Sequence, residues 1–235
     1  MISQERNLDK HVKKITIIIL YIIAVLILGI YGIAEITPKF YLSGMTKVII
    51  LCSSCISLYF GGLLLSKYIK NNKPMKINIW IFFVLYIMLF VTLTLFDIFY
   101  GRSGFSNIHW TKEILRRYIQ NSMNLIPFKT IIGYIKPLDN ISSRAVITNI
   151  VGNIIACMPF AFFLPVLFKK QNKIKVFTLT MILIVLIIES LQLITLSGSF
   201  DIDDLILNVF GAVILYLILK IKKVNQLIHK IFLNI

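Results

Sequence analysis

The sequence has few charged residues, few cysteines and very few acidic groups. Only 15% of its 235 residues are charged and 58% are hydrophobic, whereas soluble domains are roughly 45–50% apolar. A soluble globule of this size would have to expose much of that apolar surface, and a disordered chain would be far less hydrophobic. Three cysteines are too few for a disulfide scaffold. These shortages favour a membrane protein.

The sequence contains six long apolar stretches with few charged residues. A helix needs roughly 20 mostly apolar residues to cross a bilayer, so the predicted fold is all-α: a polytopic membrane helix bundle with about six transmembrane helices. The first stretch follows a lysine-rich segment and is predicted to be a retained anchor, with a cleaved signal peptide as the alternative. The predicted spans are residues 15–33, 48–65, 77–100, 146–168, 174–196 and 205–221.

Basic residues outnumber acidic ones by 25 to 10, which gives a net charge of +15. In a soluble protein such an excess would suggest nucleic acid. Here 16 of the basic residues fall on one side of the predicted zigzag of helices, and basic loops are retained in the cytoplasm. We therefore predict cytoplasmic N- and C-termini and no nucleic-acid partner. The connection at 101–144 is also basic, but its length weakens its influence, and it is placed outside.

This long outer connection contains two amphipathic stretches. Apolar residues recur at helical spacing over residues 112–120 and again over 128–135. Pro127 separates the stretches, because proline cannot continue a helix. Two short interfacial helices are therefore predicted. Arg116 and Arg117 would hold anionic lipid head groups, or alternatively would only extend from a helix that lies on the membrane.

Polar side chains occur in the outer halves of the last three predicted spans. Such side chains are costly inside a membrane and are therefore candidates for function. Each of these helices carries two of them at i, i+3 or i+4 spacing, so both project from one face. A rise of ~1.5 Å per residue puts the three pairs at a similar depth, which predicts one polar pocket open to the outside. The pairs are Asn149 and Asn153, Glu189 and Gln192, and Asp204 and Asn208.

Asp201, Asp203 and Asp204 crowd the edge of this predicted pocket. Helix capping explains one or two of these aspartates, but it does not explain Glu189 inside an apolar run. Glu189 is a candidate base, because burial raises the pKa of a carboxyl group; alternatively it is protonated or bonded to an amide of a neighbouring helix. The three aspartates are also candidate ligands of a divalent cation that would hold phosphate oxygens.

These residues match the signature of a known family. The chain has Asn-Leu-Ile-Pro-Phe at Asn124–Phe128, Asn-x-x-Gly-Asn at Asn149–Asn153 and Glu-x-x-Gln at Glu189–Gln192. It also has Asp-x-Asp-Asp-x-x-x-Asn-x-x-Gly at Asp201–Gly211. With these motifs in this order, the sequence resembles the VanZ-like family of bacterial membrane proteins over residues 80–220.

The resemblance implies a multi-pass protein of the bacterial plasma membrane. It divides the chain into a two-helix addition at 1–76, a VanZ-like domain at 77–221 and a basic cytoplasmic tail at 222–235. The founding member is associated with resistance to teicoplanin, a glycopeptide that binds cell-wall precursors outside the cell. Many members carry an arginine at the position of Ser199, so Arg102 or Arg144 would replace it in this chain.

Three functions fit these features. The first is an enzyme acting on a lipid-linked phosphate or head group in the outer leaflet. The second is a non-catalytic protein that binds a membrane lipid, a lipid-linked cell-wall precursor or the lipid tail of the antibiotic. The third, a transporter, is the weakest. A transporter binds its substrate near the midplane of the membrane, whereas the polar residues of this chain are all predicted near one surface. The catalytic candidates are Glu189, Asp201, Asp203 and Asp204, and the substrate-binding candidates are Asn124, Asn149, Asn153, Gln192, Asn208, Arg116 and Arg117.

Overall fold

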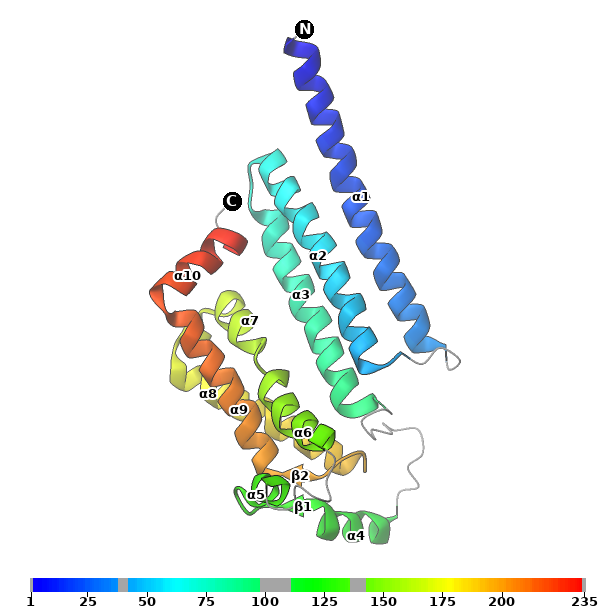
Figure 1. Cartoon of the computed structure of the whole chain (residues 1–235), viewed down its shortest axis with the longest axis vertical. Coiled ribbons are helices and arrows are strands. Elements are labelled where there is room, and N and C mark those ends of the chain that lie inside the picture. Colours follow the sequence, from blue (N-terminus) through cyan, green and yellow to red (C-terminus); the bar gives the residue numbers. More distant parts are fainter. Residues whose placement is uncertain (1, 38–41, 98–110, 136–142, 234–235) are drawn as a thin grey trace. The chain divides into compact units, whose positions relative to one another are not determined.

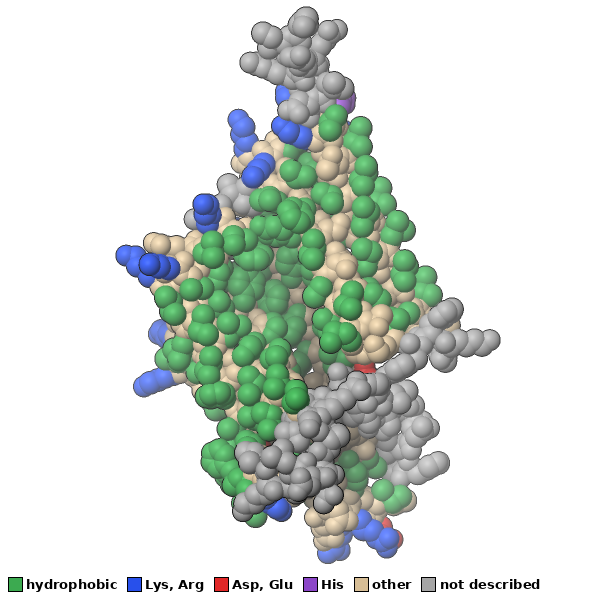
Figure 2. Space-filling view, viewed as in Figure 1, with side chains coloured by type: hydrophobic (Ala, Val, Ile, Leu, Met, Phe, Trp, Pro, Cys, Tyr) green, Lys and Arg blue, Asp and Glu red, His purple; other side chains and the backbone are tan. Residues whose placement is uncertain are grey.

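The computed structural model describes residues 2–37, 42–97, 111–135 and 143–233. Six helices within these residues are long and apolar enough to cross a membrane. Hydrophobic side chains cover the visible faces of the helices, and Lys and Arg side chains gather near helix ends (Figure 2). The predicted all-α polytopic bundle is therefore confirmed. The six spans are Lys10–Ile36, Gly44–Ile69, Lys73–Phe96, Asn149–Leu167, Ile174–Ile194 and Ile202–Lys220.

The chain forms two compact units, Met1–Leu89 with Lys222–Ile235 and Phe90–Ile221. The first unit contains α1 (Ile2–Ile36), α2 (Gly44–Ile69), most of α3 (Lys73–Val91), α10 (Lys222–Ile228) and the π-helical turn His229–Leu233. The second contains the π-helical turn η1 (Thr92–Phe96), α4 (Lys112–Ser122), β1 (Met123–Asn124), α5 (Lys129–Ile135), α6 (Ser143–Ala156), α7 (Phe160–Leu167), the 3-10 turn Lys169–Asn172, α8 (Ile174–Ile194), β2 (Phe200–Asp201) and α9 (Ile202–Lys220). The predicted domains, 1–76, 77–221 and 222–235, remain a prediction.

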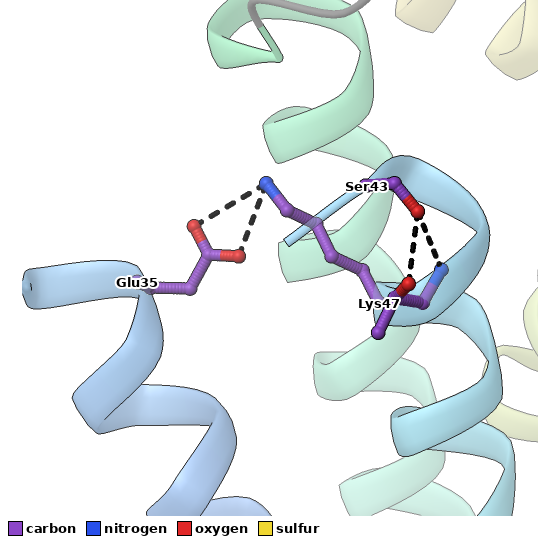
Figure 3. Close-up of polar contacts among 4 residues, drawn as sticks. Glu35, Ser43 and Lys47 are labelled. Carbon is purple, nitrogen blue, oxygen red and sulfur yellow. Dashed lines mark hydrogen bonds and ion pairs between the residues drawn. The ribbon is translucent and has the colours of Figure 1, made fainter. Parts of the chain in front are cut away.

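Within the first unit, α1 and α2 form a hairpin (Figure 1). The hydroxyl of Ser57 on α2 donates to the carbonyl of Leu20 on α1 at 2.7 Å. The Lys47 ammonium on α2 lies 3.1 Å and 3.4 Å from the two carboxylate oxygens of Glu35 on α1 (Figure 3). Since the Lys47 side chain is only 5% exposed, this ion pair favours one register of the two helices.

In the second unit, α9 packs between α6 and α8, and α4 and α5 lie across one end of these helices (Figure 1). Gly211 of α9 faces the backbone of Ile154 of α6 at close range. On the other side, the Phe177 ring of α8 stacks on the Tyr216 ring of α9 with 4.5 Å between centroids. This packing brings the start of α9 beside α6 and beside the end of α8.

The fourth span is interrupted, whereas the sequence predicted one helix over residues 146–168. A turn at residues 157–159 separates α6 from α7. Pro159 lacks the backbone N–H that a continuing helix would donate. The N–H of Phe160 instead donates to the carbonyl of Cys157 at 3.2 Å. The polar half of this span is therefore a separate short helix, α6, that ends before the apolar half begins.

The two helices predicted in the outer connection are present as α4 and α5. Thr111 begins α4, because its hydroxyl accepts the N–H of Ile114 at 3.1 Å. Pro127 lies in the turn between the helices, as expected. Both predicted head-group ligands of α4, Arg116 and Arg117, are exposed. Their position suits an interfacial helix, and lipid binding by them stays a prediction.

Candidate functional site

A short parallel bridge joins two distant parts of the chain. Strand β1 follows α4, strand β2 precedes α9, and they pair with Met123 opposite Phe200 and Asn124 opposite Asp201. The bridge holds the Asn-Leu-Ile-Pro-Phe segment next to the aspartate-rich segment. Two of the family-like motifs, 77 residues apart at Asn124 and Asp201, therefore form one structure.

Asp203 anchors α5. Its carboxylate is completely buried and accepts the backbone N–H groups of Phe128, of Thr130 at 2.8 Å and of Ile131 at 3.1 Å. These N–H groups lie at the start of α5, where a helix has no internal acceptors for them. Phe128 has a positive φ of 65°, which turns the chain into the helix. Asp203 thus caps α5 from the neighbouring helix α9.

Asp201 performs two tasks at the start of α9. It is the N-cap of α9, since its side chain accepts the N–H of Asp203 at 2.9 Å. It also accepts the amide of Asn124 at 3.0 Å and the hydroxyl of Thr130 at 2.6 Å. Capping was one of the interpretations considered for the aspartates, and the geometry of Asp201 fits it. The same carboxylate also fastens the segment that contains Asn124.

Glu189 connects α8 to the same network. Its side chain is buried, with 4% of the residue exposed, and its carboxylate accepts the N–H of Asp201 at 3.1 Å. Gln192, one turn later, is directed elsewhere, because its amide donates to the carbonyl of Thr94 in η1 at 2.9 Å. The predicted pair on α8 therefore splits: Glu189 joins the aspartates, and Gln192 holds the end of the third span.

The exposed part of the site lies on α5, α6 and the first turn of α9. The amide of Asn153 donates to the Asp204 carboxylate, and the amide of Asn149 donates to the Tyr134 hydroxyl at 2.6 Å. Asn149 is exposed, whereas Asn153, Asp204 and Tyr134 are half-buried. These four side chains are all at least partly exposed and form two hydrogen-bonded pairs. We call them the open face.

The hydroxyl of Tyr134 keeps its proton at neutral pH. Burial raises the pKa of Tyr134, and the charges of Asp204 and Asp201 raise it further, while the hydrogen bond from Asn149 acts in the opposite direction. Tyr134 is therefore a neutral hydrogen-bond donor beside acidic side chains.

Besides Gln192, three predicted site residues belong neither to the network of Asp201, Asp203 and Glu189 nor to the open face. Asn208 bonds within its own helix, since its amide donates to the carbonyl of Asp204 at 2.8 Å. Arg117 pairs with Glu113 one turn earlier on α4, and Arg116 is exposed on the same helix. The side chains of Arg102 and Arg144, the suggested substitutes for the family arginine, lie outside the described residues.

Two residues of the site were not predicted from the sequence. Thr130 and Tyr134 bond to Asp201 and Asn149, respectively. They are four residues apart on α5, so they project from the same face of that helix. This spacing, directly after the Asn-Leu-Ile-Pro-Phe run, is the signal that would have found them.

Two of the three aspartates predicted to hold a divalent cation, Asp201 and Asp203, already bind donors of the protein. Asp203 uses its carboxylate for three backbone N–H groups, and Asp201 uses its own for a hydroxyl, an amide and a backbone N–H. A cation would have to displace these donors from both side chains. Within the described parts of the chain, no three His, Cys, Asp or Glu residues are grouped in a way that could hold a metal ion.

The VanZ/LLP1 family model matches residues 83–223, which is more than half of the chain. The match covers every residue of the network described above. No curated protein and no solved structure matches the chain.

Proposed function

The chain belongs to the VanZ/LLP1 family, and we propose that it acts in the bacterial plasma membrane on the polar head group of an outer-leaflet lipid. The lipid would be a membrane lipid or a lipid-linked cell-wall precursor of the envelope. Acting on such a lipid would lower the access of teicoplanin-type glycopeptides to their target. This physiological role comes from the family resemblance.

The observation that carries the proposal is the open face itself. Asn149 is exposed at the first residue of the fourth span, and the half-buried Asn153 follows one turn later in the same span. Polar side chains at this position are costly in a membrane unless they bind something polar. A lipid head group is the polar partner available at the membrane surface, and α4 and α5 border the site there.

A catalytic version of the proposal assigns the chemistry to Glu189 and Asp204. Asp201 and Asp203 cap α9 and α5, which favours a structural role for them. Glu189 is buried beside Asp201, and a carboxylate is a group that can take a proton in general base catalysis. In this version Glu189 or Asp204 is the base, and the amides of Asn149 and Asn153 orient the head group.

A non-catalytic version assigns the open face to binding alone. The exposed side chain of Asn149 supports it, since an amide offers both donors and an acceptor to a ligand. Here the protein would sequester a lipid precursor or the lipid tail of the antibiotic.

Lipid mass spectrometry separates these versions. Cells making wild type, Glu189→Gln or Asn149→Ala are compared for total lipid composition, co-purified lipid and teicoplanin resistance, with Asn71→Ala in the exposed α2–α3 turn as the matched control. A new or missing head-group species that disappears with Glu189→Gln supports the enzyme. Unchanged lipid composition with co-purified lipid lost in Asn149→Ala supports the binder. If neither site variant changes any of the three measurements, the proposal is wrong.

A further inference from the structure

Gly152 lies inside α6 beside the open face. A Cβ atom added there would meet no atom of the described residues within 4 Å, whereas one added at Gly211 would lie 1.9 Å from the carbonyl oxygen of Ile154. Helix packing therefore requires a glycine at position 211, but no described contact requires one at position 152. Since glycine weakens the interior of a helix relative to alanine, Gly152 needs an explanation outside the packing of the described chain.

Open space at a helical glycine is not a site by itself, because Gly29 and Gly32 on α1 also have no described atom near an added Cβ. Gly152 differs in its neighbours. Asn149 lies three residues before it, so these two are neighbours on the surface of α6, and Asn153 lies one turn after Asn149. Gly152 and Asn149 are both exposed. The helix thus presents bare backbone beside the amide side chain of Asn149.

Tyr134 adds a hydrogen-bond donor to this face. Its hydroxyl oxygen accepts the amide of Asn149 at 2.6 Å, which leaves the phenolic proton to be donated. No group among the described residues accepts that proton. The raised pKa of Tyr134 keeps the proton in place at neutral pH.

We infer that the face formed by Asn149, Gly152 and Asn153 is the surface that the lipid head group touches, with Tyr134 donating a hydrogen bond to a head-group oxygen. The inference rests on the proposed function and makes it more specific. The missing side chain of Gly152 lets the head group approach the α6 backbone, and Tyr134 selects head groups with an acceptor oxygen. The phosphodiester of a glycerophospholipid and the phosphate of a polyprenyl phosphate both present such an oxygen.

The test uses two probes, a short-chain phosphatidylglycerol and a polyprenyl phosphate. Each is titrated into the purified full-length protein in detergent, and bound lipid is measured by native mass spectrometry. Wild type binds at least one probe, which also identifies the lipid class. Gly152→Leu fills the open space and weakens that binding by about tenfold with an unchanged melting temperature. Gly29→Leu, the matched change at an exposed glycine of α1, leaves binding unchanged.

A pair of tyrosine variants tests the donor separately. Tyr134→Phe weakens binding by about fivefold, the effect of one hydrogen bond, with an unchanged melting temperature. Tyr118→Phe removes a hydroxyl that donates to the carbonyl of Gly198 at 3.0 Å. That variant lowers the melting temperature and leaves the affinity for lipid unchanged.

Three results would overturn the inference. Wild-type affinity in Gly152→Leu contradicts it and leaves the proposed function standing. A changed oligomeric state with unchanged lipid binding assigns the face to contacts between copies of the chain. If wild type binds neither probe, both the inference and the proposed function fail.

Discussion

At the scale of single residues, Asp203 shows how a signature residue can serve the fold. Its buried carboxylate accepts three backbone N–H groups at the start of α5, those of Phe128, Thr130 and Ile131. The carboxylate thus replaces the carbonyl acceptors that the first turn of a helix lacks. Such contacts are needed, because a helix of seven residues is not stable alone.

We expect Asp203→Asn to lower the free energy of unfolding by about 2–4 kcal/mol, because hydrogen bonds to a charged acceptor are lost and buried N–H groups stay unpaired. An amide has one acceptor oxygen and would direct its NH2 group at the remaining donors. Thermal unfolding of the purified protein in detergent measures the effect. Glu113→Gln, which removes an exposed carboxylate from α4, is the control and changes stability little. A stable Asp203→Asn protein that has lost lipid binding would contradict the structural role.

The sequence predicted which residues matter better than it predicted what they bond to. Spacing placed Glu189 and Asp204 at a similar depth and Asp201 at the edge of the predicted pocket, and the structure connects Glu189 to Asp201. The partners Thr130 and Tyr134 could not be predicted, because β1 and β2 pair segments far apart in the chain. No helical or strand periodicity reports a contact of that kind.

At the scale of elements, the contact between α6 and α9 depends on Gly211. An added methyl group would overlap the carbonyl oxygen of Ile154, 1.9 Å away, and backbone cannot move aside as a flexible side chain can. We expect Gly211→Ala to cost about 3 kcal/mol or more, at the upper end of what overpacking usually costs. The measurement is again thermal unfolding in detergent.

The control for this prediction is Gly29→Ala on α1. No atom of the described residues lies within 4 Å of a Cβ at that position, and alanine is the better helix former. The control is therefore expected to melt at the wild-type temperature or slightly above it. If both alanine variants melt alike, the close approach of α6 and α9 is not as described.

Hydropathy predicted the continuous helices well, but it did not predict where a helix is interrupted inside an apolar stretch. All six spans and both outer helices lie where the sequence placed them. The break between α6 and α7 was missed, because Cys157 and Met158 are apolar and keep the average hydropathy high across the turn. The pair of Glu35 and Lys47 was missed for a different reason. Glu35 follows the first predicted span and Lys47 precedes the second, and charged residues are common at the ends of spans.

At the scale of the whole molecule, the distribution of the basic residues behind the net charge of +15 predicts how the protein is oriented in the membrane. With the predicted topology, the cytoplasmic side carries 16 basic and two acidic residues, and the outer side carries nine basic and eight acidic ones. An even number of spans puts both termini on one side. The positive-inside rule then assigns that side to the cytoplasm and the open face to the outer surface, where a glycopeptide would meet its lipid-linked target.

Cysteine labelling tests this orientation directly. In a variant with Cys52, Cys55 and Cys157 replaced by alanine, a single cysteine is introduced at the exposed Ser199, before β2, or at the exposed Asn71, between α2 and α3. We expect a membrane-impermeant maleimide to label Ser199→Cys in intact cells and Asn71→Cys only after the cells are permeabilised. The opposite pattern would put the open face in the cytoplasm. A site there would not meet an extracellular antibiotic, so the proposed route to resistance would be wrong even if the protein bound lipid.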